Sequence, residues 1–216
     1  ANRLLASQNP RRLEAEFVRD NALFVAGALN LRDVGGPSVK PYQPPGYYAA
    51  LQFPDRDYVA SQDDEQWRRG VYMHWQRTFL HPMLANFDAP SRDECAAQRV
   101  ISNTPQQALT LLNDPTFVEA ARLFAARMVG AAPADAARLR QGFLLALARE
   151  PKPAELASLQ AFLGTQREHY RANVGEAEKL LRVGLAPPPA GNPAELAAWT
   201  SVARVILNLQ EVITRY

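Results

Sequence analysis

Apolar residues recur every three or four positions over residues 10–29 and again over most of residues 91–209, a spacing typical of amphipathic helices. Asn9 followed by Pro10 suits an N-cap and a first helical turn, which predicts a first helix from Pro10 to about Leu29. The predicted apolar stripe of this helix consists of Leu13, Phe17, Phe24 and Ala28, with Val18, Val25 and Leu29 beside it.

Helix start signals follow one another closely after residue 90. They are capping boxes or prolines at a first helical position, and they stand at Ser91 with Glu94, Thr104 with Gln107, Asp114-Pro115, Pro153, and Asn192-Pro193. The helix opened by Pro115 has a continuous apolar face, made of Phe117, Val118, Ala121, Phe124 and Met128. Further helices are predicted before Pro151 and at 176–182, and residues 185–192 predict a proline-rich connector.

Residues 31–66 differ from the rest of the chain because glycine and proline interrupt them repeatedly. This pattern predicts a long irregular insertion after the first helix. Five aromatic residues in it form a candidate contact surface: Tyr42, Tyr47, Tyr48, Phe53 and Tyr58. Such rings suit a sugar or a protein partner, but they also suit packing onto the helices to hold the loop in place. Residues 67–80 fit a strand or a helix, and we predict a helix.

These patterns predict a mostly α-helical, irregular multi-helix fold, with residues 1–216 as a single domain. A chain of 216 residues is long enough for one sizeable core. Its net charge of +2 provides no strong field for a nucleic acid or a membrane surface. No apolar run approaches the roughly 20 residues that a membrane span requires. We therefore expect neither nucleic-acid binding nor a membrane span.

Motifs for metal and cofactor chemistry are absent from the sequence. The three histidines, His74, His81 and His169, show no ligand spacing, so we expect no metal. The single cysteine, Cys95, rules out an internal disulfide and a C-x-x-C-H haem attachment site, and we expect it to be buried and inert. Residues 35–37, Gly-Gly-Pro, can bind an anion through backbone amides, although a tight turn is favoured.

The main candidate site is a polar run between Met83 and Asp114, together with two carboxylates of the first helix. The candidate residues are Glu16, Asp20, Asp88, Arg92, Arg99, Asn103, Gln107, Asn113 and Asp114. Our leading interpretation is a structural network that satisfies buried polar groups. The alternative is a ligand pocket lined by Asp88, Arg92 and Asn103.

Glu16 and Asp20 are one helical turn apart and share a face. Asp20 also falls on the predicted apolar stripe, where burial raises the pKa of a carboxyl group, as a general acid requires. The favoured alternative is that Asp20 pairs with an arginine such as Arg92 or Arg99.

Short sequence blocks spread along the chain resemble a known family. They include Arg12-Leu13-Glu14-Ala15-Glu16, Arg19-Asp20, Gly35-Gly36-Pro37-Ser38-Val39, Arg68-Arg69, Asn103-Thr104-Pro105, and Glu195 to Thr200. Together they resemble a planctomycete-specific domain of unknown function found in large bacterial proteins that also carry cytochrome c-type domains. Gly70 and Gln210 depart from the family pattern.

The resemblance implies that this chain is the C-terminal part of a longer exported protein, periplasmic or extracellular, whose haem lies outside this segment. We therefore expect no cofactor here, and a non-catalytic binding or assembly module. Its partners would be other domains of the parent protein, another protein or a polysaccharide. The alternative function is a polysaccharide hydrolase or lyase that uses Asp20, Asp88 or Glu16.

Overall fold

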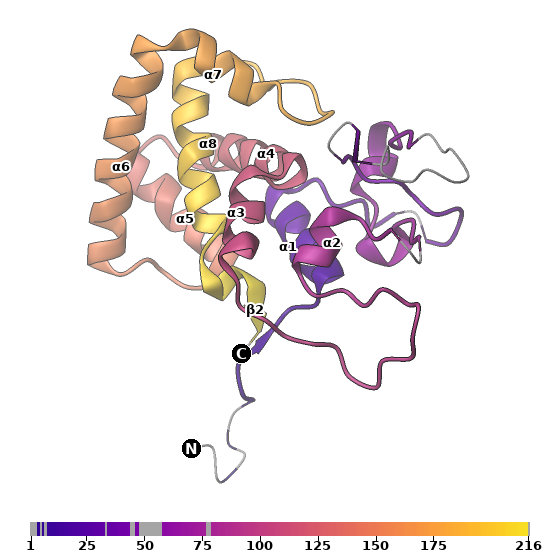
Figure 1. Cartoon of the computed structure of the whole chain (residues 1–216). Helices are drawn as coiled ribbons and strands as arrows, with labels where there is room; N and C mark the ends of the chain where they lie inside the picture. Colours follow the sequence, from indigo (N-terminus) through magenta and orange to yellow (C-terminus); the bar gives the residue numbers. More distant parts are fainter. Residues whose placement is uncertain are drawn as a thin grey trace.

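A computed structural model describes residues 4, 6, 8–32, 34–43, 46–47, 58–76 and 79–215. The predicted mostly α-helical, multi-helix fold is confirmed (Figure 1). The α-helices of the described residues are α1 Ala15–Ala26, α2 Pro82–Asn86, α3 Pro105–Asn113, α4 Pro115–Ala131, α5 Asp135–Leu147, α6 Pro153–Ala172, α7 Val174–Leu181 and α8 Pro193–Leu207. Short 3-10 helices are η2 Asp63–Trp67, η3 Gly70–Tyr72 and η4 Gln210–Ile213.

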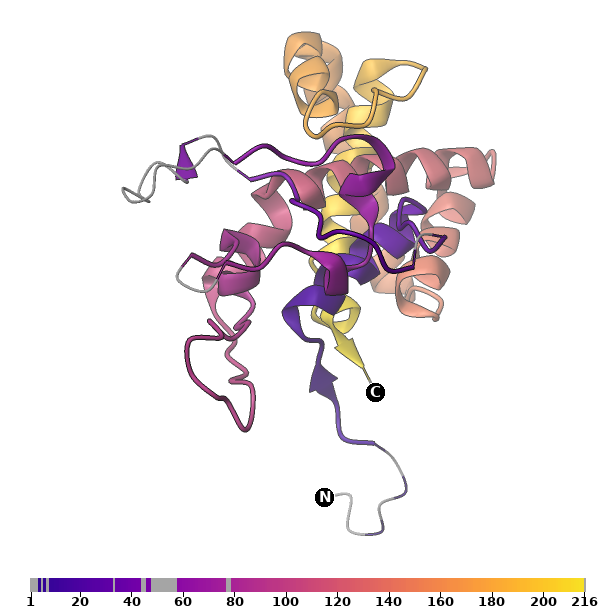
Figure 2. The same cartoon turned by 90° about the vertical axis from the view of Figure 1, so that its right-hand side faces the viewer.

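Helix α8 lies at the centre of the helical core, packed against α4, α6 and α7, while α1 packs on the other side of α4 (Figures 1 and 2). Trp199 of α8 is completely buried, as are Phe117 and Phe124 of α4, and Phe143 of α5 is almost completely buried. The apolar face predicted for the helix opened by Pro115 is therefore the face that forms the core.

Local start signals correctly predicted four of the helices after residue 103. Thr104 and Gln107 form the capping box of α3, and Asp114 accepts a hydrogen bond from the Thr116 N–H at 2.9 Å to cap α4. Pro153 begins α6, and Asn192 caps α8. The caps of α3, α4 and α8 satisfy backbone N–H groups that the first helical turn leaves without partners, and Pro153 has no N–H that needs a partner.

The first helix is shorter than predicted. It begins at Ala15, because β1 (Arg11–Arg12) pairs antiparallel with β2 (Thr214–Arg215) near the end of the chain. Leu13 extends this pairing by donating from its N–H to the Ile213 carbonyl at 2.8 Å. Gly27, at φ +76°, ends α1 in the left-handed conformation that glycine adopts easily.

The buried face of α1 also differs from the predicted stripe. Val18, Leu23 and Val25 are buried, whereas Phe17 and Phe24 are 56% and 59% exposed. Both sets have helical spacing, and the smaller residues pack against α4. The two phenylalanines consequently lie on the outside of the molecule.

The predicted helix at Ser91 does not form; residues 90–100 are bends and loop. Arg92 has φ +63°, which is incompatible with a first helical turn, and its guanidinium lies 3.8 Å from the centroid of the Trp75 ring. Residues 91–99 also lack an apolar face that packing could stabilise. Cys95, expected to be buried, is therefore exposed.

The helix predicted over residues 67–80 is also wrong for its described part, 67–76 and 79–80, apart from the single turn η3. The backbone there pairs with the preceding segment instead. Asn30 donates to the Trp67 carbonyl at 2.8 Å, and Val39 donates to the Tyr72 carbonyl at 2.8 Å. Isolated parallel bridges join Asn30 to Arg68 and Val39 to Met73.

Buried polar side chains attach the irregular segment to α1. Arg19, which is fully buried, donates to the Arg68 carbonyl at 2.8 Å and to the Gln66 carbonyl. Arg68 in turn donates to the carbonyls of Pro37 at 2.9 Å and Gly35. Residues 35–37 form consecutive bends, and Gly35 and Gly36 have φ near +80°.

The proline-rich connector is held against α4 by a buried pair. The Glu119 carboxylate accepts from the N–H groups of Leu185 at 2.8 Å and Ala186 at 2.5 Å. Arg122 donates to the carbonyls of Ala186 and Pro187, both at 2.8 Å. The connector is thus fixed by side chains that α4 contributes.

Candidate functional site

The polar run forms a first cluster around Asp88, which we call the Asp88 cluster: Arg12, Asp88, Ser102 and Gln107. Arg12 forms an ion pair with the Asp88 carboxylate and donates to Gln107 Oε1 at 2.7 Å. Ser102 donates to Asp88 from its N–H at 2.9 Å and from its hydroxyl at 2.7 Å. Each polar side chain of the cluster therefore has several partners inside the cluster.

The electrostatics of Asp88 reflect this crowding of donors. Burial by itself raises the pKa of the Asp88 carboxyl, but hydrogen bonds from Ser102 and the Arg12 guanidinium outweigh burial and hold the pKa below its ordinary value. Asp88 is therefore ionised at neutral pH. An ionised carboxylate with this many donors is unsuited to act as a general acid.

A second pair, Glu16 and Arg99, joins α1 to the loop formed by residues 90–100. Arg99 donates from both terminal nitrogens to Glu16, at 2.6 Å and 3.0 Å, a bidentate arrangement. Burial raises the pKa of Glu16, and the Arg99 hydrogen bonds reverse that effect, so the pKa of Glu16 is lowered overall. Glu16 is thus also an ionised carboxylate with an internal partner.

Asp20 has a different partner from the arginines that the sequence suggested. Both of its carboxylate oxygens accept from the Gly70 N–H, at 2.7 Å and 2.9 Å. Gly70 permits this approach, because a Cβ there would lie 2.8 Å from the Glu16 Cβ. Burial raises the pKa of Asp20, the direction predicted from the sequence, while nearby Arg19 opposes the shift. The predicted pairing of Asp20 with an arginine is present, but the partner is Arg19, at 3.5 Å, and not Arg92 or Arg99.

The remaining candidates have local roles or lie apart. Gln107 completes the capping box of α3, and Asp114 caps α4, with a pKa that burial raises. Asn113 donates to the Leu109 carbonyl at 3.0 Å. Arg92 stacks on Trp75, and Asn103 is exposed in the loop before α3.

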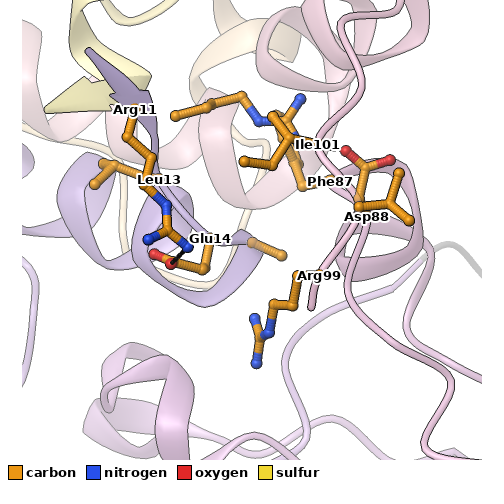
Figure 3. Close-up of a pocket in the computed structure, with 10 residues that line it drawn as sticks. Arg11, Leu13, Glu14, Phe87, Asp88, Arg99 and Ile101 are labelled. Carbon is orange, nitrogen blue, oxygen red and sulfur yellow. Dashed lines mark hydrogen bonds and ion pairs between the residues drawn. The ribbon is translucent and has the colours of Figure 1, made fainter. Parts of the chain in front are cut away.

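A narrow slot lies beside Asp88, with a cavity volume of only about 10 Å³. Asp88 and Glu14 lie on opposite sides of it, with Arg99 and Ile101 between them along its edge (Figure 3). Arg92 and Asn103 are not among its lining residues. A slot of this volume has room for about one water molecule, not for a sugar ring.

The tyrosine-rich stretch is only partly visible. Tyr48 and Phe53 lie outside the described residues. Tyr47 stacks with Phe79 at a centroid distance of 4.8 Å, and the Tyr58 hydroxyl donates to the Pro41 carbonyl at 2.5 Å. The contacts of these two rings fit the interpretation in which the aromatic residues hold the loop in place. The contact-surface interpretation stays a prediction.

Sequence reasoning missed an open groove on the outer side of α1, which we call the α1 groove. Its cavity volume is about 380 Å³, and it is lined by Leu13, Glu14, Phe17, Asp20, Asn21, Phe24, Leu29 and Arg215. The signal was present, because Phe17 and Phe24 are seven residues apart and so share one helix face. They were assigned to the core because their spacing also fits a buried stripe.

The clustering of side chains and the composition of the helices bear on two classes of function. Within the described residues, no three His, Cys, Asp or Glu side chains come together in a way that could hold a metal ion. No helix in that part of the chain has both the length and the apolar composition needed to cross a membrane.

The chain is a helical protein, and the carboxylates of its candidate site mainly form ion pairs and hydrogen bonds with other segments of the same chain. Residues 1–163 match the family described as PSD1, Protein of unknown function (DUF1553), and the chain belongs to this family. Membership of a family of unknown function is thus confirmed. No curated protein and no solved structure matches the chain.

Proposed function

We propose that this chain is a non-catalytic binding or assembly module of a larger exported protein that also carries c-type cytochrome domains. Its contact surface is the α1 groove, and its partner is another domain of the same parent protein. The observation that carries the proposal is the exposure of Phe17 and Phe24 on one face of a rigid helix.

Exposed phenylalanines in a groove favour contact with a protein. Each ring leaves more than half of its surface in water, and burial of apolar surface is worth about 25 cal/mol per Å². Helix α1 is fixed by the buried Arg19 and by its packing on α4, so the two rings are held on an ordered element. A rigid aromatic pair requires little ordering on binding, which is how binding hot spots are usually built.

The state of the carboxylates argues against the polysaccharide-active enzyme. Asp88 is held by Arg12 and Ser102, and Glu16 is held by Arg99. Asp20 accepts from a backbone N–H of η3. A glycosidase pair requires two carboxylates that face one substrate-sized cavity. Asp20 lines the α1 groove, whereas Asp88 lines a slot of about 10 Å³, and Glu16 lines neither of them.

The wider context of the proposal rests on the family resemblance. A parent protein with c-type haem would work in the periplasm or outside the cell, because such haem is attached after export. The haem would lie in another part of the parent, since the single cysteine of this chain cannot form two thioether links. The module would then position or join the other domains.

The test is a titration between two separately purified pieces, this chain and the remainder of its parent protein. Isothermal calorimetry should show saturable association, and Phe17→Ser with Phe24→Ser should weaken it by about tenfold or more, a loss of at least about 1.4 kcal/mol. The matched control is Leu109→Ser with Leu144→Ser, which alters two other exposed apolar residues.

Two outcomes would contradict the proposal. One is an association that the phenylalanine and control variants weaken equally, because the α1 groove would then not be the contact surface. The other is cleavage of a polysaccharide by the isolated chain that Asp88→Asn abolishes without unfolding the protein. The second result would establish the enzyme instead.

A further inference from the structure

A second groove lies where four segments of the chain meet, and we call it the Trp67 groove. Its cavity volume is about 630 Å³, larger than that of the α1 groove and within the size range of small-ligand sites. It is bounded by the end of α1 with residues 27–32, by η2 with Trp67, by α4 with Leu123 and Arg127, and by Ala186 of the connector.

The walls of the Trp67 groove are fixed by contacts described above. Asn30 is joined to the Trp67 carbonyl, Ala186 is held by Glu119 and Arg122 of α4, and Gly27 ends α1 beside Arg127. A groove built from segments tied to one another keeps its shape without a ligand. Preformed shape is what small-ligand sites usually show.

Charged side chains stand at two edges of this groove. Arg127 uses Nη1 to donate to the carbonyls of Phe24 and Val25. Its Nε and Nη2 have no hydrogen-bond partner among the described residues, and the side chain is exposed. At another edge, Arg32 pairs with Asp64 at 2.6 Å, and both side chains are mostly exposed. The edges thus carry two guanidinium groups and one carboxylate.

The inner wall supplies an aromatic ring. Trp67 lines the groove, and its indole N–H is buried without a hydrogen-bond partner in the part of the chain that the structure describes. Around the ring, the wall consists mainly of small and aliphatic residues, Ala26, Ala28, Leu29 and Leu123. An apolar floor with a few polar groups at the edge suits a ring that has apolar faces and polar substituents.

From this arrangement we infer that the Trp67 groove binds an acidic saccharide unit of the uronic-acid type. The sugar ring lies against Trp67 and the aliphatic wall, and the free edge of the Arg127 guanidinium binds the carboxylate. Asp64 accepts hydrogen bonds from ring hydroxyls, and Arg32 donates to them. The Trp67 groove adjoins the α1 groove at Leu29, which lines both, but the proposed ligand does not depend on the domain contact.

The probe is a glucuronic-acid-containing disaccharide, titrated into the intact chain in a calorimeter. A neutral glucose disaccharide and hexanoate, a carboxylate without a sugar, are titrated in parallel. We expect saturable binding of the acidic disaccharide, and at least about tenfold weaker binding of the other two compounds. Equal binding of the neutral disaccharide, or of hexanoate, would overturn the assignment of the ligand class.

Two variants test the location. Arg127→Gln should weaken binding of the acidic disaccharide by about tenfold and should leave the weak binding of the neutral disaccharide unchanged. Since Arg127 also contacts the end of α1, Ala186→Phe tests the site independently by filling the groove. Arg140→Gln, an exposed arginine of α5, is the control and should bind like the unaltered chain. Absence of binding up to about 1 mM acidic disaccharide, or binding that survives Arg127→Gln and Ala186→Phe, would refute the inference.

Discussion

Replacing Arg12 with alanine is the change that tests the Asp88 cluster most sharply. The Arg12 side chain is 7% exposed and reaches Asp88, Gln107 and the Ser102 carbonyl. Its neighbour Arg11 is 48% exposed, and its one ion-pair partner among the described residues is Glu14, at 3.2 Å. The two arginines are adjacent on β1, so Arg11→Ala is a control of the same residue type, in the same strand, at a different depth.

The expected cost follows from what is left behind. Without Arg12, the Asp88 carboxylate keeps its Ser102 donors but loses its compensating charge, and Gln107 loses a partner in a buried position. Removing one member of a buried ion pair costs about 3–5 kcal/mol. Because Asp88 retains the Ser102 hydrogen bonds, we expect about 3 kcal/mol, against less than about 0.5 kcal/mol for the exposed Arg11 pair.

The same reasoning gives a smaller cost for replacing Arg99. If Arg99 belonged to a fully buried network, Arg99→Ala would cost about 3–5 kcal/mol. Its side chain is instead 32% exposed, so water can replace part of its contact with Glu16. We now expect about 1 kcal/mol for Arg99→Ala.

Urea unfolding at pH 7, followed by far-ultraviolet circular dichroism, measures all three free energies of unfolding. The predicted order of destabilisation is Arg12→Ala, then Arg99→Ala, then Arg11→Ala. A double-mutant cycle between Arg12 and Asp88 isolates their coupling from other effects. If Arg12→Ala costs no more than Arg11→Ala, the Asp88 cluster is not a structural network, and this reasoning fails.

Three further predictions concern pH, backbone geometry and haem. His81 is buried, which lowers its pKa to about 4, and it accepts from the Met83 N–H while its other ring nitrogen bonds the Tyr42 carbonyl, so the neutral form is favoured. The free energy of unfolding should therefore fall by up to about 3 kcal/mol as pH drops from 6.5 to 4, because the unfolded state binds the proton more readily. The His81→Asn variant should lose this pH dependence. A free energy of unfolding that does not change with pH in the unaltered chain would contradict the assignment. Gly184→Ala should destabilise the chain by about 2 kcal/mol or more in urea unfolding, because Gly184 has φ +93° and a Cβ would lie 2.4 Å from the Glu119 carboxyl carbon. An unchanged midpoint of unfolding would show that the contact of Glu119 with the connector is not rigid. The isolated chain should be colourless and lack a Soret band after expression in a host competent for cytochrome c maturation, and stoichiometric haem would move the function toward electron transfer.

Features governed by neighbouring residues could be predicted from the sequence. The starts of α3, α4 and α8 depend on Thr104, Asp114 and Asn192, whose side chains bond to backbone groups two or three residues away. The apolar face of α4 follows from spacing alone. Such local signals act whatever the rest of the chain does.

Features governed by distant residues could not be predicted. The start of α1 depends on Arg11 pairing with Arg215, and the structure of residues 67–76 depends on Asn30 and Val39. Two equally spaced stripes compete on α1, and only packing on α4 decides which one is buried. Local signals at Ser91 indicated a helix that has no apolar face to bury.

The candidate site shows the same division. The sequence singled out Asp88, Glu16 and Arg99, but their partnerships span 76 residues for Arg12 with Asp88 and 83 for Glu16 with Arg99. Arg12 and Ser102 were missed as members of the network because nothing local distinguishes them. The Phe17 and Phe24 face was missed because an exposed aromatic pair has the same spacing as a buried one.

The central claim is that the outer face of α1 binds another part of the parent protein. Hydrogen–deuterium exchange compares peptides covering residues 15–29 in the isolated chain and in the whole parent protein. The account predicts slower exchange in those peptides of the whole protein, and a return toward the isolated rate with Phe17→Ser and Phe24→Ser. Equal exchange in both proteins, with protection appearing only elsewhere on the chain, would contradict it.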